Sequence, residues 1–488
     1  MEKTVFICAD HGLAIVYFLQ SDVLNTLLAS DIKVILLTDD GLKDQIARKF
    51  GQPGLIIEGL RLKEARYYLT HNATTIQWWM NFLRRVGASN RINLEAMISH
   101  IHQVEVEAGG KRRLLMQLVK PLIGLLRRSS FARKALVRSQ EFFTPNLYTD
   151  YFEKYKPDLV VASTPGWRLD RYLLRQAKRL GIKTAAVVVG WDNPSSYSLS
   201  GAPVDWINCW SAIQKEELVL GSDWEPEKVN IGGIPSYDGY FKKQWLMSRE
   251  DYFRYHHLDP QRKLLGYACS FITFSPNYQN IEALARLVAE DSFTKPCQLL
   301  IRLHPNHFMD EPLFTGERER IFQLAHTLPN VHVVEPVPLG GELGYYSGED
   351  MPEKTSMMAY SDVFLTVYST MVVEAAIHDR PIVSMCFDAP GGWNQPGRFS
   401  LPLSEIGEWP THQRFRQAGG GRVALEQSHL IKAINLYLDN PDTDKEQRQQ
   451  FIRDEVTFTD GSAGRRTGEF LLSLLDRNIP DVLVRGKR

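Results

Sequence analysis

The stretch LLIRLHPNHF, residues 299–308, joins an apolar run to polar side chains, two of which are histidines. Its first five residues are apolar except for Arg302, which is typical of a buried strand, and Pro305 then ends the strand because proline has no N–H to donate. His304 therefore sits at a strand end, where its imidazole can project into the cleft and donate a hydrogen bond or carry positive charge. Arg302, two residues earlier on the same strand face, can add positive charge. A histidine that only caps the strand end is the alternative.

A second group lies in the segment DVFLTVYSTMVVEAAIHDRPIVSM, residues 362–385. Ser369 and Thr370 follow an apolar strand and open a helix, where hydroxyls and free backbone N–H groups can hold a phosphate. Glu374 is one helical turn beyond Thr370, so its carboxylate can accept hydrogen bonds from the hydroxyls of a ribose. Its neighbours are apolar, and an unpaired carboxylate is costly there, which favours a functional role over a solvated glutamate. The loop after residues 263–270 offers three further hydroxyls, those of Ser270, Thr273 and Ser275.

Strand ends in the first half of the chain carry candidates for a general base. The apolar run at residues 4–10 ends at Asp10, and His11 and Gly12 follow directly. Gly12 lets a substrate approach the backbone closely there, so His11 and Asp10 are both candidates, and the family resemblance given below makes His11 the leading one and Asp10 the runner-up. Asp192, in the segment GWDNPSSYS, is either a third candidate or part of a plain Asx turn.

Two of these groups carry a resemblance. The order strand, Ser-Thr, helix, Glu, Arg-Pro-Ile-Val resembles the nucleotide-binding half of GT-B glycosyltransferases. The His-Pro strand end is similar to the group that uses cytidine-linked donors, which includes bacterial polysialyltransferases and CDP-glycerol glycerophosphotransferases. The loop TDGSAGRR resembles the C-terminal loop of the CDP-glycerol enzymes, and GWDNPSSYS resembles a turn of some surface-polysaccharide transferases. CDP-glycerol enzymes tend to have Asp where Glu374 stands, whereas Glu is usual in sugar-nucleotide transferases.

The resemblance implies a role for each residue of the two groups. His304 would contact the pyrophosphate of a nucleotide donor, Ser369 and Thr370 its phosphate oxygens, and Glu374 its ribose. The likeness extends over residues 263–475 and, in outline only, over residues 1–60 and 157–240.

The elements that must position these residues alternate as they do in doubly wound parallel sheets. Helical patterns over about residues 60–145 and a Gly/Pro-rich linker at 225–241 interrupt the alternation. The first half has five expected strands, at residues 4–10, 33–40, 157–164, 183–194 and 205–211. The second half also has five, at residues 263–270, 297–305, 331–336, 363–369 and 381–387.

This organisation predicts an α/β protein of the GT-B type, with two Rossmann-like domains facing across a cleft. Residues 1–240 are the expected acceptor-binding domain, with a helical insertion at about 60–145, and residues 241–488 are the expected donor-binding domain. A length of 488 residues suits two domains of roughly 200 residues or more. Ligands bind outside the carboxyl ends of parallel strands, so the candidates above should line the cleft.

The insertion has the composition of a membrane-surface element. Residues 111–138 contain nine Lys or Arg and no acidic residue, and Pro121 can start a second helix there. Basic and aromatic side chains on amphipathic helices are attracted to anionic membranes. A pair of helices that packs between domains, with a solvated basic face, is the alternative. The expected acceptor- or membrane-binding residues are Trp78, Trp79, Arg127, Arg128, Arg133 and Lys134.

Composition narrows the function classes. Lys+Arg and Asp+Glu both number 57, and no nucleic-acid-binding motif accompanies the basic segment, so we expect no nucleic-acid partner. The five cysteines are scattered without a CxxC pair, and there is no signal peptide and no long apolar stretch, which indicates a cytoplasmic protein. The sequence has no P-loop and no metal-ligand spacing, so we expect no cofactor and a metal-independent mechanism in which His, Arg and a helix dipole neutralise the leaving nucleotide.

The predicted function is transfer of a sugar from a UDP- or CDP/CMP-linked donor to a lipid-linked or cell-surface polysaccharide acceptor, on the inner face of the plasma membrane. Transfer of a polyol phosphate, as in the CDP-glycerol enzymes, is one alternative. A non-hydrolysing UDP-sugar 2-epimerase is another, although such an enzyme has no need of the basic insertion. A non-catalytic binding protein of the same fold is the third, because fold alone does not establish a reaction.

Overall fold

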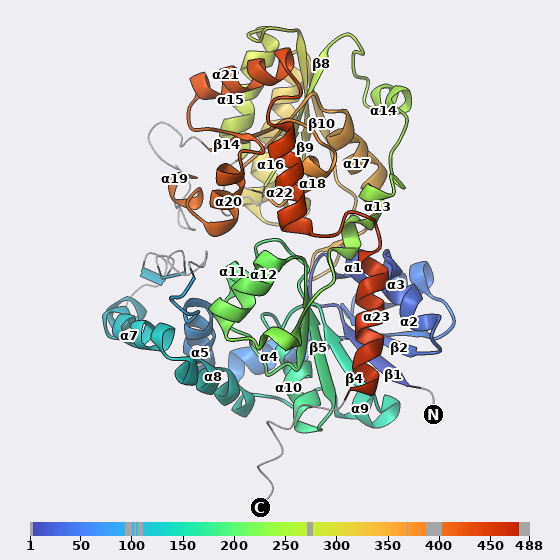
Figure 1. Cartoon of the computed structure of the whole chain (residues 1–488), viewed down its shortest axis with the longest axis vertical. Coiled ribbons are helices and arrows are strands. Elements are labelled where there is room, and N and C mark those ends of the chain that lie inside the picture. The colour runs from blue at the N-terminus through green and yellow to red at the C-terminus, as the bar shows by residue number, and fades with distance from the viewer. Residues whose placement is uncertain are drawn as a thin grey trace, which may run out of the picture. The chain divides into compact units, whose positions relative to one another are not determined.

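The computed structural model describes residues 3–92, 100–101, 104–105, 111–270, 277–367, 369–386 and 403–477 (Figure 1). The chain forms two compact units. Unit 1 comprises the residues up to Asp238, the segment Leu339–Tyr345 and the residues from Val456 on. Unit 2 comprises Gly239–Pro338 and Tyr346–Glu455.

Unit 1 is built on a parallel sheet of seven strands in the order β3-β2-β1-β4-β5-β6-β7. Each strand is short and apolar, which suits a sheet that is covered on both faces. The chain runs outward from β1 to β3 and then crosses to β4 on the other side, so the strand order reverses between β1 and β4. The bounds are β1 Thr4–Cys8, β2 Lys33–Thr38, β3 Leu55–Gly59, β4 Leu159–Ala162, β5 Lys183–Val187, β6 Trp206–Cys209 and β7 Val229–Ile231.

The helices of unit 1 cover this sheet, and their apolar side chains join the strands in one core. Those of the α/β alternation are α1 Ala14–Leu19, α2 Asp22–Leu28, α3 Lys43–Phe50, α4 Leu62–His71, α9 Thr149–Tyr155, α10 Arg171–Arg179, α11 Asn193–Tyr197 and α12 Ala212–Glu216.

The expected helical insertion is present as α5 Thr74–Val86, α7 Lys111–Arg128 and α8 Ser130–Ser139 (Figure 1). It has a small core of its own, in which Phe82 and Val86 of α5 pack with Met116 and Ile123 of α7. The prediction that Pro121 starts a second helix is wrong, because Pro121 lies inside α7. The helix survives the loss of one backbone hydrogen bond because Met116 and Ile123 anchor it on both sides.

The break between helices comes instead at Ser129, which caps α8. Its hydroxyl accepts a hydrogen bond from the backbone N–H of Ala132 at 3.2 Å. A serine in this position satisfies a donor that the first turn leaves unpaired.

The last described helix, α23 Ala463–Asp476, packs in unit 1 rather than in unit 2. It lies against α2, and its Gly464 and Gly468 allow the close approach: a Cβ on Gly464 would stand 2.7 Å from the backbone nitrogen of Asp22. Asp238 accepts hydrogen bonds from the backbone N–H groups of Ala463 and Gly464 at 2.9 and 2.8 Å, which caps the N-terminus of the helix. The prediction that residues 241–488 form one domain is therefore wrong for this segment.

A second segment of the expected C-terminal domain, residues 339–345, also belongs to unit 1. The hydroxyl of Tyr345 donates to the backbone oxygen of Ala9 and accepts from the hydroxyl of Thr38 at 3.0 Å. Asp39 accepts from the backbone N–H of Glu342 at 2.6 Å. These contacts use polar groups at the ends of β1 and β2, so no local sequence pattern marks the insertion.

Unit 2 is built on a parallel sheet of six strands in the order β10-β9-β8-β13-β14-β15. The five strands expected from residue 263 onward are all present. β15 was not expected, because three residues are too few to show a pattern. The bounds are β8 Lys263–Ala268, β9 Cys297–Arg302, β10 Val331–Val334, β13 Val363–Thr366, β14 Ile382–Met385 and β15 Arg422–Ala424.

Helices again provide the cover and the core of unit 2. They are α13 Asp238–Phe241, α14 Arg249–Tyr255, α15 Asn277–Ala289, α16 Pro312–Thr327, α17 Met351–Tyr360, α18 Met371–Ile377, α19 Leu403–Ile406, α20 Pro410–Ala418, α21 Gln427–Asp439 and α22 Lys445–Val456. A separate pair of short strands, β11 Pro338–Gly340 and β12 Tyr345–Tyr346, lies where the chain passes through unit 1 and returns.

The packing of α23 on α2 predicts the effect of adding one methyl group. A Cβ on Gly468 would stand 2.5 Å from Cβ of Thr26, whereas a Cβ on Gly124 of α7 would meet nothing within 4 Å. We expect Gly468→Ala to lower the free energy of unfolding by about 1–3 kcal/mol, the usual cost of overpacking. Gly124→Ala, the matched control, should be neutral or stabilising by up to about 1 kcal/mol because alanine favours helix. Urea unfolding measures both, and equal effects would contradict the close packing of α23.

Candidate functional site

The polar residues expected at the donor site follow three adjacent strands of unit 2. β8 pairs with β9 on one side and with β13 on the other, and all three run parallel, so their carboxyl ends share one edge. Ser270 follows β8, His304 follows β9 and Ser369 follows β13. The strand order reverses between β8 and β13, which is where ligands bind in open α/β sheets. Thr273 and Ser275 lie outside the described residues.

His304 begins a tight 3-10 turn, Pro305–Phe308, and is half-buried. Its Nδ1 accepts a hydrogen bond from the backbone N–H of Asn306 at 3.1 Å, so in the neutral ring the proton is on Nε2. Burial and the neighbouring His307 lower the pKa of His304 to about 3. The imidazole is therefore neutral near pH 7 and can offer an N–H donor but not a positive charge.

His307 and Glu317 fix this turn, although no sequence pattern marked either residue. The Nδ1 of His307 accepts from the backbone N–H of His304 at 3.0 Å, and its Nε2 is 3.0 Å from a carboxylate oxygen of Glu317. Both side chains are fully buried. A buried imidazole–carboxylate pair is costly unless both partners are satisfied, so the strand end is held in one conformation.

Glu374 of α18 is buried, as its apolar neighbours predicted. Its Oε2 accepts a hydrogen bond from the hydroxyl of Tyr240 and is 2.6 Å from Nζ of Lys354. Burial next to Glu374 raises the pKa of Tyr346 to about 12. Within the described part of the chain Oε1 has no such partner, which leaves it able to accept from a further donor.

Arg302 does not act as the predicted source of charge for a donor. Its guanidinium is buried and forms ion pairs with Asp350 and Glu353. Burial opposes the charged form, but the two carboxylates outweigh it and raise the pKa of Arg302. Two acids already compensate this single positive charge, so we assign Arg302 a structural role. The sequence around β9 could not reveal these two acids, because Asp350 and Glu353 lie about 50 residues later, at the start of α17.

Ser369 and Thr370 stand where α18 begins, and both are half-buried. The hydroxyl of Ser369 accepts a hydrogen bond from the backbone N–H of Met371 at 3.3 Å. This is a local capping contact, and a phosphate would have to replace it to use the same N–H. Ser270 is buried at the end of β8.

In unit 1, Asp10 and His11 follow β1 at the point where the strand order reverses. Asp10 is buried, and its Oδ2 accepts from the backbone N–H of Asp170 at 2.8 Å while its Oδ1 is 3.4 Å from Nε of Arg168. Burial raises the pKa of Asp10 against the opposing effect of Arg168. The Nδ1 of His11 accepts from the backbone N–H of Leu13 at 3.1 Å. Burial and Arg168 lower the pKa of His11 to about 3.

Asp170 completes a buried pair of carboxyl groups with Asp10. It follows β4, and its Oδ2 accepts a hydrogen bond from the hydroxyl of Thr164 at 2.6 Å. Burial, and then the neighbouring charge of Asp10, raise the pKa of Asp170 to about 7. In the sequence Asp170 resembles any acidic residue near a helix start, so only the pairing of β1 with β4 reveals it.

Asp192 is half-buried and directly precedes α11. Its carboxylate accepts a hydrogen bond from the hydroxyl of Ser196 at 2.7 Å, and its backbone oxygen accepts from Ser195 at 3.0 Å. Burial raises the pKa of Asp192. These short-range contacts are those of the local turn that the sequence left as an alternative.

The structure separates the six residues expected at a membrane. Trp78 and Trp79 are half-buried and pack on Phe82, with ring centroids 5.6 and 5.7 Å apart. Arg133 is buried and makes two contacts with Asp223, at 2.6 and 2.8 Å. A membrane role for Arg133 is therefore wrong.

The other three basic residues are more accessible. Arg127 is half-buried and donates to the backbone oxygen of Ala88 at 3.2 Å, whereas Arg128 and Lys134 are exposed. No helix among the described residues has the length and apolar character needed to cross a bilayer.

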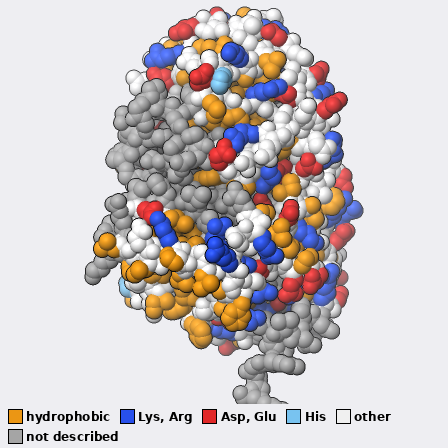
Figure 2. All heavy atoms as spheres, turned by 60° about the vertical axis from the view of Figure 1, so that its left-hand side comes forward, with side chains coloured by type: hydrophobic (Ala, Val, Ile, Leu, Met, Phe, Trp, Pro, Cys, Tyr) orange, Lys and Arg blue, Asp and Glu red, His pale blue; other side chains and the backbone are white. Residues whose placement is uncertain are grey.

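The outward face of α7 exposes apolar side chains that the sequence analysis did not single out. Leu114, Leu118 and Leu125 are 77%, 75% and 62% exposed, and Phe131 at the start of α8 is 84% exposed. Leu122, also exposed, completes a stripe along one face of the helix. Figure 2 shows hydrophobic side chains gathered on the face that carries these helices, with Lys and Arg beside them. We call Leu114, Leu118, Leu122, Leu125 and Phe131 the leucine stripe.

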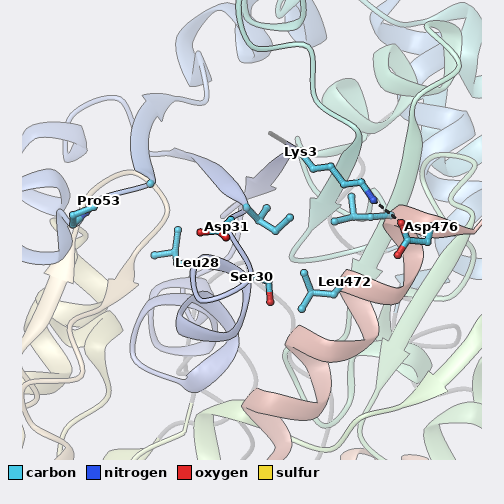
Figure 3. Close-up of a pocket in the computed structure, with 10 residues that line it drawn as sticks. Lys3, Leu28, Ser30, Asp31, Pro53, Leu472 and Asp476 are labelled. Atoms are coloured by element: carbon cyan, nitrogen blue, oxygen red, sulfur yellow. Dashed lines mark hydrogen bonds and ion pairs between the residues drawn. The ribbon is translucent and has the colours of Figure 1, made fainter. Parts of the chain in front are cut away.

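A hollow lies at the amino ends of the strands of unit 1, away from the polar residues at their carboxyl ends. It has a volume of about 860 Å³ and opens in unit 1 beside the start of β1 and the end of α23 (Figure 3). Lys3 and Asp476 form an ion pair of 2.5 Å across part of it. Because ligands of open α/β sheets bind at the carboxyl ends of strands, we do not assign this hollow to the chemistry.

No protein-family model matches the chain, and no curated protein matches it in sequence. Solved structures share its fold, among them the UDP-GlcNAc 2-epimerase of Neisseria meningitidis bound to UDP-GlcNAc, with a TM-score of 0.52 and 13% identity over 97% of this chain and 100% of that chain. A glycosyltransferase of Rickettsia africae is similar with a TM-score of 0.52 and 11% identity over 98% of this chain and 100% of that one. The predicted GT-B fold, with two parallel-sheet α/β domains, is therefore confirmed.

The neutral state of His304 predicts a pH dependence. The folded ring takes a proton only near pH 3, whereas the unfolded chain takes one near the usual value of about 6.5. Between these values the unfolded state binds more protons, so the free energy of unfolding falls as the pH is lowered. The slope from this residue is at most about 1.4 kcal/mol per pH unit, less because solvent reaches the half-buried ring.

Urea unfolding between about pH 7 and 5 measures this slope. His304→Gln should give a shallower fall than the parent, and His326→Gln, which alters an exposed histidine, should leave the slope unchanged. An unchanged slope in His304→Gln would show that the folded ring titrates normally.

Proposed function

We propose that the chain is a glycosyltransferase that moves a sugar from a nucleotide-sugar donor to a lipid-linked or cell-surface polysaccharide acceptor. The observation that carries the proposal is the edge of unit 2, where Ser270, His304 and Ser369 follow three adjacent parallel strands at the reversal of strand order. Glu374 stands one helical turn beyond the start of α18. The fold is also that of proteins described as nucleotide-sugar enzymes.

Each donor-side residue has a distinct part in this proposal. His304 donates a hydrogen bond from Nε2 to the leaving diphosphate, and Ser369 and Thr370 contact its phosphate oxygens at the start of α18. Oε1 of Glu374 accepts from the ribose, while Lys354 and Tyr240 hold Oε2. We expect transfer without a metal ion, since these donors can stabilise the leaving group.

In this proposal the base that deprotonates the acceptor hydroxyl is one of the residues at the carboxyl ends of the strands of unit 1. A base works best when its pKa lies near the working pH. The pKa of His11 is lowered to about 3, whereas burial raises the pKa of Asp10. In this proposal Asp10 therefore ranks above His11, and Asp192, whose pKa is also raised, is the alternative.

A UDP-sugar 2-epimerase is the second candidate, because solved epimerases share the fold over nearly the whole chain. The feature that favours transfer is the insertion of α5, α7 and α8 with its leucine stripe. An epimerase acts on a water-soluble nucleotide sugar and needs no apolar outer face. A transferase with a lipid-linked acceptor gains from one, since it brings the protein to the acceptor.

We place the leucine stripe against an anionic membrane, on the inner face of the plasma membrane. An apolar stripe beside basic residues is what a helix needs to lie in the lipid interface. A hollow of about 660 Å³ continues the surface between Phe131 and Phe142, with Lys134, Arg138 and Arg179 in its lining. These three cations suit anionic lipid headgroups, which attract nearby Lys and Arg by about 1 kcal/mol each.

Nucleotide binding tests the donor side. A thermal-shift panel of UDP, CMP, CDP, GDP and ADP should give one responding base, and a ligand at 100 times its dissociation constant stabilises by about 2.7 kcal/mol. A response to UDP supports a UDP-sugar as the donor. A response to CMP or CDP alone supports a cytidine-linked donor of a sugar or of a polyol phosphate. No response to any of the five would contradict the donor site.

Glu374→Gln should weaken binding of that nucleotide by about tenfold, the loss of a charge-assisted hydrogen bond. Glu353→Gln is the matched control. Glu353 is also a buried carboxylate in an ion pair, but it lies on α17 and its partner is Arg302 of β9. Isothermal titration measures both affinities. Equal affinities in the two variants would refute the ribose contact.

The leucine stripe predicts a second outcome. Replacing Leu114, Leu118 and Leu125 together with Ser should weaken binding to anionic vesicles about a thousandfold or more in a sedimentation assay, because about 1.5–3 kcal/mol is lost per buried leucine and each 1.4 kcal/mol is tenfold in affinity. Leu180→Ser, at an exposed leucine outside the stripe, should have no effect. If the parent and the triple variant sediment equally, this face is not the membrane contact.

A further inference from the structure

Unit 1 concentrates arginine at the reversal of its strand order. Arg84 and Arg85 end α5, Arg168 lies between β4 and α10, and Arg171 and Arg175 lie on the first two turns of α10. Each is buried or half-buried. Repulsion among them contributes to the lowered pKa of Arg84 and of Arg85, after burial, and Arg171 acts on both.

Three of these guanidinium groups are held by neutral partners. Arg84 donates to the backbone oxygens of Tyr197 and Leu199 at 2.9 and 2.8 Å and to Oδ1 of Asn81 at 2.9 Å. Arg171 donates to the same Oδ1 at 3.2 Å and to the backbone oxygen of Arg168 at 2.5 Å.

Arg175 completes the set, with Gly201 among the backbone oxygens that accept from it, and its pKa falls to about 9 because of burial and Arg171. Carbonyl and amide oxygens satisfy the N–H groups of these side chains but do not neutralise their charge.

The other two guanidinium groups have donors to spare. Arg85 is half-buried and lies over the ring of Tyr197 at 5.7 Å, and among the described residues it has no hydrogen bond or ion pair. Arg168 contacts Asp10 through Nε at 3.4 Å, and its two terminal NH₂ groups have no partner in the described part of the chain. Both lie beside Tyr197, because Arg85 is over its ring and Arg168 directly follows Trp167, which stacks on that ring.

Two aromatic rings and a buried donor lie beside this pair. Trp167 stacks on Tyr197 with ring centroids 5.2 Å apart, and among the described residues its buried indole N–H has no hydrogen-bond partner. Asp10 and Asp170 lie beside this group, and Glu141 lies near Arg175. Burial and the charge of Asp10 raise the pKa of Asp170 to about 7. Among the described residues, five guanidinium groups therefore face these three carboxyl groups.

We propose that Arg85 and Arg168, with the indole N–H of Trp167, form an oxyanion site in unit 1 that binds a phosphate group of the acceptor. A planar guanidinium presents paired N–H donors that match the oxygens of a phosphate. The location fits, because ligands of open α/β sheets bind where the strand order reverses. A bound dianion would also relieve the excess of positive charge described above.

This inference rests on the proposed function for its substrate: a lipid- or sugar-linked phosphate is the acceptor group that would place a hydroxyl near Asp10 and His11. The site consists of residues of unit 1, whereas the donor residues belong to unit 2. Inorganic pyrophosphate can therefore probe it without any nucleotide sugar.

The test is isothermal titration of the full chain with inorganic pyrophosphate at low ionic strength. Arg85→Gln and Arg168→Gln should each weaken binding tenfold or more, and Arg85→Lys should weaken it less because it retains the charge. Arg48→Gln, at an exposed arginine of α3, should bind as the parent does. Far-UV circular dichroism confirms folding, and replacing Arg85 breaks no hydrogen bond among the described residues.

Two further arms complete the test. Ser369→Ala reports on pyrophosphate bound at the donor side, so a loss in that variant alone, or no loss in either arginine variant, would overturn the inference. Such a result would leave the nucleotide test of the proposed function untouched. A short isoprenyl diphosphate that binds more tightly than pyrophosphate, and loses affinity in Arg85→Gln, identifies a lipid-linked group. Equal affinities with the same arginine dependence identify a site for the phosphate alone.

Discussion

Parallel strands bring the polar residues of several strand ends to one edge of a sheet, and charge that is buried there must be compensated. Unit 2 meets this constraint internally. Arg302 has two acidic partners, and Glu374 has Lys354. His304 avoids the cost by staying neutral, with its turn held by a buried histidine–glutamate pair. These pairings fix the geometry of the edge before any ligand arrives, which lowers the cost of binding.

Unit 1 meets the same constraint differently. Asp10 and Asp170 share a buried position, and the arginines around them outnumber the acids. The charge of these arginines is met mostly by neutral oxygen atoms, while Arg85 and Arg168 keep donors to spare. The sheet edge is electrically balanced in unit 2 and positive in unit 1, and each edge by itself matches the ligand proposed for it, a nucleotide donor in unit 2 and an anionic acceptor in unit 1. The leucine stripe matches the membrane proposed for it in the same way, since a lipid surface presents both apolar chains and anionic headgroups.

The sequence predicted the features that depend on short-range patterns. Apolar runs ending in polar residues located β9 and β13, and the apolar setting of Glu374 correctly predicted its burial. It failed where the deciding partner is remote. The acids that neutralise Arg302 and the aspartate that binds Arg133 lie far along the chain. Amphipathic pattern also could not tell which apolar face of α7 is packed, because both faces carry leucines or other apolar residues.

The proposed glycosyltransferase moves a sugar from its nucleotide to an acceptor, whereas an epimerase changes the sugar while it stays on the nucleotide. The direct measurement uses UDP-sugars labelled in the sugar, with anionic vesicles that carry polyprenyl-diphosphate-linked saccharides, and follows both the label and free UDP. Sugar transfer predicts that the label moves to the vesicle fraction while an equal amount of UDP is released. A label that stays on the nucleotide as an epimer, with no release of UDP beyond the enzyme-free control, would contradict it.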